Sequence, residues 1–178
     1  QSGVADPTVS NPPESMVARV EEQPGVKEAA AISLVTDAIP SDPSAIVFGV
    51  EPDSFVARRL VVGEGRRPRA GEVMVGDGFA ASEDVGPGDT VVLKGEPFRV
   101  SGVYHAGVGF EDAGVVSSIP FATRLAGERL GVTTIAVTLQ PQASEDTVSA
   151  QLRRTFPGTM TIANPGQAAR ANPSFEII

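Results

Sequence analysis

The sequence contains no cysteine and no tryptophan, and it has a single histidine and a single tyrosine. The lack of cysteine excludes disulfide bonds, thiolate metal sites and a cysteine nucleophile. It leaves the compartment open, because an oxidising environment permits disulfides without requiring them. Aromatic residues make up only 5% of the chain, so the core must be built mainly from aliphatic side chains. The many valines among them favour strands.

Positive charge is also scarce, and the formal net charge is −8. A protein that binds nucleic acid needs a basic face. The only local cluster of basic residues is Arg66, Arg67 and Arg69, which we interpret as exposed charges that balance Glu64 and Glu72. We therefore expect no nucleic-acid partner, and we expect the acidic surface to keep the domain in solution.

The sequence also lacks the common catalytic motifs. It has no Gly-x-x-x-x-Gly-Lys phosphate loop, no Gly-x-Ser-x-Gly elbow and no His-Glu-x-x-His motif. We predict no cofactor and no metal, and we interpret His105 as a surface or packing residue. A small hydrolase that uses His105 remains an alternative. The apolar runs, such as residues 29–36, fall far short of the roughly 20 residues that span a bilayer.

Hydrophobic periodicity and turn residues predict alternating helices and strands. We expect a first helix that ends before Pro24-Gly25, a short helix that begins at Pro120 and stops at Gly127, and a last helix capped by Ser144. Residues 61–70 and 106–114 are predicted to be irregular. The remaining predictions are helical turns over 52–60 and 78–84, and strands over 26–36, 45–50, 72–75, 90–93, 98–104, 115–116, 133–139 and 160–163.

This order predicts an α+β fold with two parts. Residues 14–51 and 131–165 have similar α/β character, so we expect both chain ends to form one subdomain. Residues 52–130 are rich in β-strands and are predicted to be inserted into it. Residues 1–13 and 166–178 are read as linkers, because Gly and Pro break regular structure there. We expect the inserted part to move as a unit relative to the other part, since interdomain motion is the default across a modest interface.

An ordered set of short motifs is more specific than any single residue. Val47-Phe48-Gly49-Val50-Glu51-Pro52 is followed by Gly71-Glu72-Val73-Met74-Val75-Gly76 and by Val85-Gly86-Pro87-Gly88-Asp89-Thr90-Val91. Phe98-Arg99-Val100-Ser101-Gly102-Val103 and Ile119-Pro120-Phe121 complete the set. This order resembles the MacB-like periplasmic core domain of ABC transporter permeases of the FtsX, MacB and lipoprotein-release type. The resemblance covers nearly the whole chain from residue 14.

The resemblance implies that the domain lies on the extracytoplasmic side of the cell membrane, between the first two transmembrane helices of a permease. It implies a porter-like α/β subdomain with a β-rich insertion. It further implies an ATP-binding subunit or domain as partner, a second permease copy in a dimer, and a substrate or envelope protein that the sequence does not identify. Such permeases transmit motion to the outer compartment. We therefore expect both chain ends to lie at one pole of the domain, towards the membrane.

Partner contact is predicted for the loop from Ala106 to Gly114, through Phe110, Glu111 and Asp112. We expect this loop to be mobile and exposed, because an exposed aromatic side chain with acids beside it suits a protein interface. The alternative is that Phe110 folds back onto the β-rich part. A free-standing module that binds a lipid or peptide outside the cytoplasm is the main alternative to the permease domain. A membrane-length apolar stretch on each side of these residues in the full gene would favour the permease.

Overall fold

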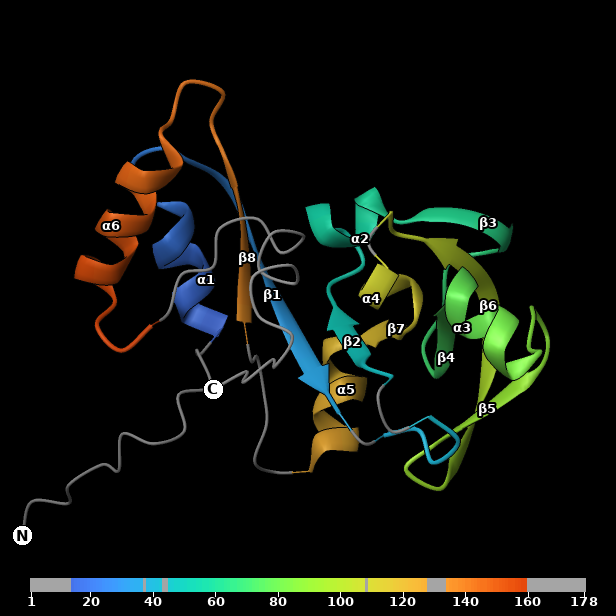
Figure 1. Ribbon diagram of the computed structural model, residues 1–178. Helices are drawn as coiled ribbons and strands as arrows, with labels where there is room; N and C mark the ends of the chain where they lie inside the picture. The colour runs from blue at the N-terminus through green and yellow to red at the C-terminus, as the bar shows by residue number, and fades with distance from the viewer. Residues whose placement is uncertain (1–13, 37, 43–44, 108, 128–133, 160–178) are drawn as a thin grey trace, which may run out of the picture. The chain divides into compact units, whose positions relative to one another are not determined.

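The structure, a computed structural model, describes residues 14–36, 38–42, 45–107, 109–127 and 134–159. The described chain divides into two compact units, with boundaries between residues 17 and 18, 29 and 30, and 136 and 137; the first unit holds residues 30–136 and the second holds residues 18–29 and those after 136. The described strands form an eight-stranded mixed sheet in the order β3-β6-β4-β7-β2-β1-β8, with β5 paired to β6 (Figure 1). The α+β class is as the sequence predicts, whereas the predicted subdomain boundaries stay a prediction.

The strands are β1 (Val26–Val35), β2 (Val47–Val50), β3 (Val61–Gly65), β4 (Glu72–Gly76), β5 (Thr90–Leu93), β6 (Glu96–His105), β7 (Val115–Ser118) and β8 (Thr134–Leu139). The helices are α1 (Glu14–Glu21), α2 (Phe55–Arg59), α3 (Asp77–Glu83), α4 (Gly109–Asp112), α5 (Ile119–Ala126) and α6 (Glu145–Thr155). Most predicted elements are present with ends that differ by one or two residues. The predicted strand at 160–163 lies outside the described residues.

The central strands of the first unit are buried on both faces. In β4, Val73 and Val75 belong to one hydrophobic cluster and Met74 to the other, because successive side chains of a strand point to opposite faces. Phe79 of α3 and Phe121 of α5 cover the first cluster. Residues of α2 cover the second. Two-sided burial explains why these strands appear in the sequence as continuous apolar runs.

Helix α5 lies close to strand β2. Both ends of this helix are as predicted: a proline lies in its first turn, and Gly127 caps its last turn. A side chain at Gly49 would collide with Ala122, whose Cβ lies 2.5 Å from the position of the missing Cβ. The ring of Phe121 meets that of Phe98 edge to face, with 4.5 Å between the centroids. Glycine at position 49 therefore allows the helix to approach the sheet closely.

Strands β5 and β6 form a hairpin, and β6 starts two residues before the predicted strand 98–104. Leu93 pairs with Glu96, which leaves Lys94 and Gly95 as the two-residue turn. Both turn residues have positive φ, 49° and 84°, as hairpin turns of this length require. The turn explains why a non-glycine residue, Lys94, adopts the left-handed region here.

Strand β3 is a correction to the sequence prediction, which read residues 61–70 as irregular. It pairs antiparallel with β6, and the register shifts between Val62 and Glu64. The β-bulge places Gly63 outside the regular ladder, and Gly65 has a φ of 71°. The two glycines therefore belong to an irregular edge strand. Because they interrupt the alternation of apolar and polar residues, the local sequence pattern does not reveal this strand.

The second unit, by itself, packs α6 against the end of α1. The amide of Gln140 donates to the carbonyl oxygen of Gly25 at 2.9 Å. The Arg19 guanidinium lies over the ring of Phe156, 5.0 Å from its centroid. Val148 is buried, and its Cγ2 would be only 2.7 Å from a Cβ at position 25. The Pro24-Gly25 turn is thus fixed by close packing as well as by its φ of 86°.

The sheet overturns one expectation about motion. Strand β2 belongs to the segment 14–51, and β7 belongs to the predicted insertion 52–130. The two strands pair in parallel, from Val47 with Val115 to Val50 with Ser118. Because backbone pairing is continuous across this boundary, the prediction that residues 52–130 move as a unit relative to the other part is wrong. The prediction that both chain ends lie at one pole concerns residues outside the described part.

Candidate functional site

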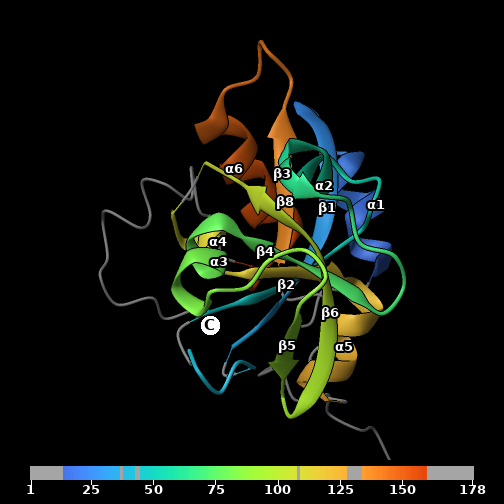
Figure 2. The ribbon, with the colours of Figure 1, turned by 90° about the vertical axis from the view of Figure 1, so that its right-hand side faces the viewer.

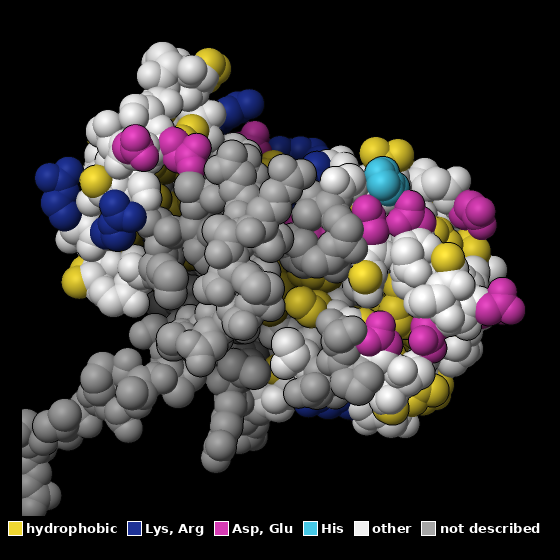
Figure 3. All heavy atoms as spheres, in the orientation of Figure 1, with side chains coloured by type: hydrophobic (Ala, Val, Ile, Leu, Met, Phe, Trp, Pro, Cys, Tyr) yellow, Lys and Arg dark blue, Asp and Glu magenta, His cyan; other side chains and the backbone are white. Residues whose placement is uncertain are grey.

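A polar cluster gathers where β6 ends, α3 begins and α4 ends. Tyr104 and His105 are the last residues of β6, Asp77 is the first residue of α3, and Glu111 and Asp112 close α4. Helices α3 and α4 contact each other, and both contact strand β4, so the two helices lie together against the sheet (Figures 1 and 2). Figure 3 shows the histidine at the surface with acidic side chains next to it.

The backbone at Gly76 and Gly78 allows this meeting. A Cβ at position 76 would lie 2.5 Å from the carbonyl carbon of Asp112 and 2.8 Å from its Cα. A Cβ at position 78 would lie 3.1 Å from the Asp112 carbonyl oxygen. The amide of Gly76 also donates to the carbonyl oxygen of Gly114 at 2.9 Å. These glycines bring Asp112 against the start of α3, and hence close to Asp77.

His105 lies between two carboxylates. Its Nδ1 atom is 2.8 Å from Oδ2 of Asp77 and 3.4 Å from Oδ2 of Asp112. The side chains of His105 and Asp77 are 58% and 51% exposed, whereas that of Asp112 is only 12% exposed. Asp112 is held in place because its Oδ1 accepts a hydrogen bond of 2.5 Å from the amide of Ala106. The cluster is therefore open to solvent on one side and fixed on the other.

Tyr104 and Glu111 form the inner part of the cluster. The Tyr104 hydroxyl donates to the carbonyl oxygen of Glu111 at 2.6 Å. Burial raises the pKa of this phenol above its ordinary value, and the nearby carboxylates of Glu111, Asp112 and Asp77 raise it further. Tyr104 is thus a neutral donor that anchors α4. The Glu111 carboxylate pairs with Arg59 through Oε1, while its Oε2 is buried and has no hydrogen-bond partner among the residues that the structure describes.

These contacts correct one sequence prediction and leave another in place. Asp112 is buried, with 8% of its surface exposed, so the expectation that this residue is exposed is wrong. The segment is tied down by the Tyr104 hydroxyl, the Ala106 amide and the glycine contacts. The side chain of Phe110 lies outside the described part. Contact of Phe110, Glu111 and Asp112 with a partner stays a prediction.

Sequence reasoning missed Asp77 and Arg59 as members of this cluster. Asp77 is far from His105 in the chain, and only the parallel pairing of β4 with β6, which aligns Gly76 with Tyr104, brings the two together. Arg59 reaches Glu111 across more than 50 positions of the chain. The one available signal is the Gly76-Asp77-Gly78 sequence directly after a buried strand.

The hydrolase alternative requires a nucleophile activated by His105. Within the described residues, no serine or threonine hydroxyl hydrogen-bonds to His105, and its polar neighbours are the two carboxylates. The arrangement matches a set of cation ligands or an ion pair better than a hydrolytic triad, in which the imidazole contacts a hydroxyl.

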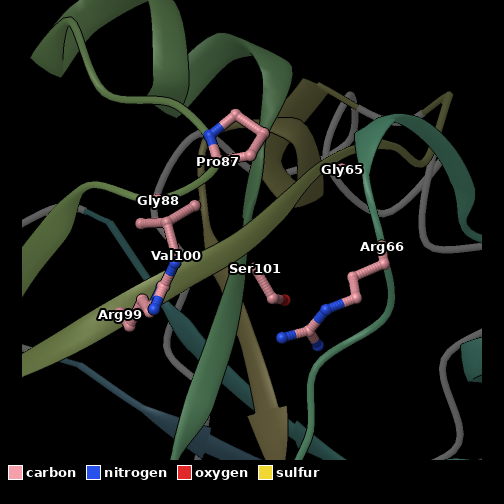
Figure 4. Close-up of a pocket in the computed structure, with 7 residues that line it drawn as sticks. All are labelled: Gly65, Arg66, Pro87, Gly88, Arg99, Val100 and Ser101. Atoms are coloured by element: carbon pink, nitrogen blue, oxygen red, sulfur yellow. The ribbon is translucent and has the colours of Figure 1, made fainter.

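A second polar site is a pocket of about 390 Å³ beside β6 (Figure 4). Arg66 follows β3 and Arg99 lies in β6, and both line this pocket. The Arg66 guanidinium is already engaged, because it donates two hydrogen bonds of 2.6 Å to Glu72. This pair lowers the pKa of Glu72 to about 2, with help from the amide of Arg69. The expected balance of Arg66 by Glu72 is confirmed.

Arg67 differs from the expectation of a surface ion pair. Its guanidinium donates to the carbonyl oxygens of Ala57 and Leu60, at 2.8 and 3.2 Å. It therefore satisfies the last carbonyl groups of α2, where a cation also complements the helix dipole. The three arginines do not form an anion-binding cluster of free guanidinium groups.

Comparison with known proteins agrees with this architecture. The profile of the MacB-like periplasmic core domain matches residues 1–155. The periplasmic region of MacB from Actinobacillus actinomycetemcomitans has a similar structure, with a TM-score of 0.59 and 15% identity over 83% of this chain and 76% of that one. No curated protein matches the sequence.

The extracellular domain of the noncanonic ABC-type transporter YknZ from Gram-positive bacteria is also similar, with a TM-score of 0.56 and 15% identity over 80% of this chain and 82% of that one. At this identity the two structures show the shared fold. The family match covers most of the chain, and this chain belongs to the MacB-like periplasmic core domain family, the extracytoplasmic domains of MacB-like ABC transporter permeases. Among the described helices, none is long and apolar enough to cross a membrane.

Proposed function

We propose that this chain is the part of a permease subunit that transmits ATP-driven motion to a substrate or partner outside the cytoplasmic membrane. The observation that carries the proposal is the family match over residues 1–155. The role is export or extraction of a substrate, or control of an envelope protein. The domain itself performs no chemistry in this proposal.

ATP hydrolysis is assigned to a separate nucleotide-binding subunit or domain. The 178 residues contain no phosphate loop, which is the usual element that cradles the phosphates of ATP in such ATPases. A second permease copy completes the assembly as a dimer. The isolated chain should therefore show no ATP turnover in a preparation free of contaminating ATPases, and specific turnover would contradict this assignment.

A stiff first unit supports the transmitting role. Its strands β4, β7 and β2 are almost wholly buried on both faces, with side chains such as Val47, Val73 and Val115 at 0% exposure. Close-packed interiors resist deformation and pass strain to their neighbours. In this proposal the strands of the first unit act as one body, and α4 with Phe110, Glu111 and Asp112 lies beside the surface that meets a partner.

The proposal is tested in the full-length permease with its ATPase in a membrane. Residues 14–159 are replaced by a flexible Gly/Ser linker, and ATP turnover is measured beside the transport or partner-activation activity. We expect ATP turnover to persist and the outer activity to be lost. Full outer activity without the domain would overturn the proposal. Loss of the outer activity is also expected if the domain works as a free-standing module. The 178-residue chain is therefore also added back in soluble form, and rescue of the outer activity would favour the free-standing alternative.

A further inference from the structure

The spacing of Asp77, His105 and Asp112 matches that of metal ligands. One donor atom from each residue lies within 4.8 Å of the other two. Tetrahedral zinc with bonds of about 2.0–2.1 Å places its ligand atoms roughly 3.3 Å apart. The observed distances from His105 Nδ1 to the two carboxylates, 2.8 and 3.4 Å, lie on either side of this value. The three donor atoms are therefore close enough together to share one ion.

The charge around the cluster is unbalanced. Asp77, Glu111 and Asp112 bring three carboxylates together, and Arg59 pairs with Glu111. In the described part of the chain, no lysine or arginine forms an ion pair with Asp77 or Asp112. The buried Oε2 of Glu111 adds an acceptor without a donor. Charges that are withdrawn from water are usually paired with an opposite charge or bound to a metal ion, so this group of carboxylates favours a bound cation.

The three side chains come from different elements but are held in fixed positions. The backbone of Asp112 is fixed by contact with Gly76 and Gly78, and its Oδ1 atom by the Ala106 amide. Its Oδ2 atom is thereby left facing the imidazole. Asp77 and His105 are more than half exposed, so an ion can enter from solvent and keep water in its remaining coordination positions.

We propose that Asp77, His105 and Asp112 form a binding site for one divalent transition-metal ion, with Zn²⁺ as the matching ion. Two carboxylates and one imidazole with open positions suit zinc and its neighbours in the first transition row. Mg²⁺ and Ca²⁺ prefer sites made only of oxygen atoms. This proposal does not depend on the transporter function, because it rests on three side chains of the first unit.

The single histidine makes a direct test possible. The ¹⁵N-labelled 178-residue chain, with any purification tag removed, is titrated with ZnCl₂ while the long-range ¹H–¹⁵N spectrum of its one imidazole is recorded. We expect saturation at one ion per chain and a large shift of the Nδ1 signal, because Nδ1 faces both carboxylates. A shift of Nε2 instead, or no shift, would overturn the proposal. The same titration with MgCl₂ should leave the imidazole signals unchanged, and an equal response would contradict the choice of metal.

Calorimetry with three variants distinguishes the site from adventitious binding. Asp77→Ala and Asp112→Asn should each weaken Zn²⁺ binding at least tenfold, and Asn at 112 keeps an acceptor for the Ala106 amide. The matched control is Asp84→Asn, which removes one exposed carboxylate next to the far end of α3. Zinc affinity should be unchanged in this control. If all three variants bind zinc as the unsubstituted chain does, the ion binds elsewhere. Circular dichroism without metal verifies that each variant is folded.

Discussion

Replacement of Gly76 by alanine should destabilise the junction of β4, α3 and α4. Gly76 has an ordinary φ of −68°, so alanine brings no backbone strain and the effect is purely steric. The added Cβ would lie 2.5 Å from the carbonyl carbon of Asp112, and ordinary contact begins at 3.4 Å. The Asp112 carbonyl oxygen would lie closer still, so the backbone of α4 must retreat by at least about 0.9 Å, the difference between these two distances.

Overpacking of this kind costs about 1–3 kcal/mol. For a chain of this size, each kcal/mol lowers the melting temperature by roughly 2–4 °C, so we expect a decrease of about 2–12 °C. Gly63→Ala is the matched control, because a Cβ there would have its nearest neighbour at 3.9 Å, the carbonyl oxygen of Val103. We expect the control to change the free energy of unfolding by less than about 0.5 kcal/mol.

The assay is thermal and denaturant unfolding of the two variants, with amide hydrogen exchange as a local probe. In Gly76→Ala, the Ala106 amide should exchange faster, because its acceptor on Asp112 moves away. Equal stability of the two alanine variants, with unchanged exchange at Ala106, would refute the claim that close backbone approach positions α4.

Two further predictions concern an ion pair and the core. Glu72 should titrate with a midpoint near pH 2 in a carboxyl NMR experiment, and Arg66→Gln should move the midpoint towards the ordinary value of 4.5. Because the pKa is lowered on folding, the stabilisation is complete above about pH 4.5 and is lost as the pH falls through about 2; a midpoint near 4.5 in the unsubstituted chain would contradict the pairing. Phe121→Ala should lower the free energy of unfolding by about 3–5 kcal/mol, because Phe121 is buried against Phe98. Val92→Ala at a 47% exposed position is its control in denaturant unfolding, and similar losses in both variants would contradict the assigned core.

Local signals in the sequence predict most of the fold. Pro120 and Gly127 mark both ends of α5, and Lys94-Gly95 marks the β5–β6 turn, because these residues have conformational preferences that act over a few positions. Strand β3 is not predicted, because the bulge at Gly63 and the positive φ at Gly65 interrupt the alternation of apolar and polar residues in this edge strand. Pairing across the sheet is what makes it a strand.

The candidate site is less accessible to sequence reasoning. Glu111 and Asp112 can be singled out from their loop, but their burial depends on Tyr104 and on the missing side chain at Gly76. The approach of Asp77 to His105 follows from the register of β4 and β6, which no local pattern reveals. Long-range pairing likewise joins β2 to β7, which contradicts the expected motion of residues 52–130 relative to the other part.

The central claim is that this domain lies outside the cytoplasmic membrane as part of a permease. Because this chain has no cysteine, a cysteine introduced into it is the only thiol of the domain and can be labelled in the full-length protein. Val61→Cys places a thiol at a 63% exposed position, and Val73→Cys places one at 0% exposure as the control. The full-length protein without the added cysteine gives the background.

The decisive measurement is labelling of intact spheroplasts or protoplasts with a membrane-impermeant maleimide. The account predicts that Val61→Cys is labelled before lysis and that Val73→Cys is labelled only after denaturation. Labelling of Val61→Cys that appears only when the membrane is broken would place the domain in the cytoplasm and contradict the account.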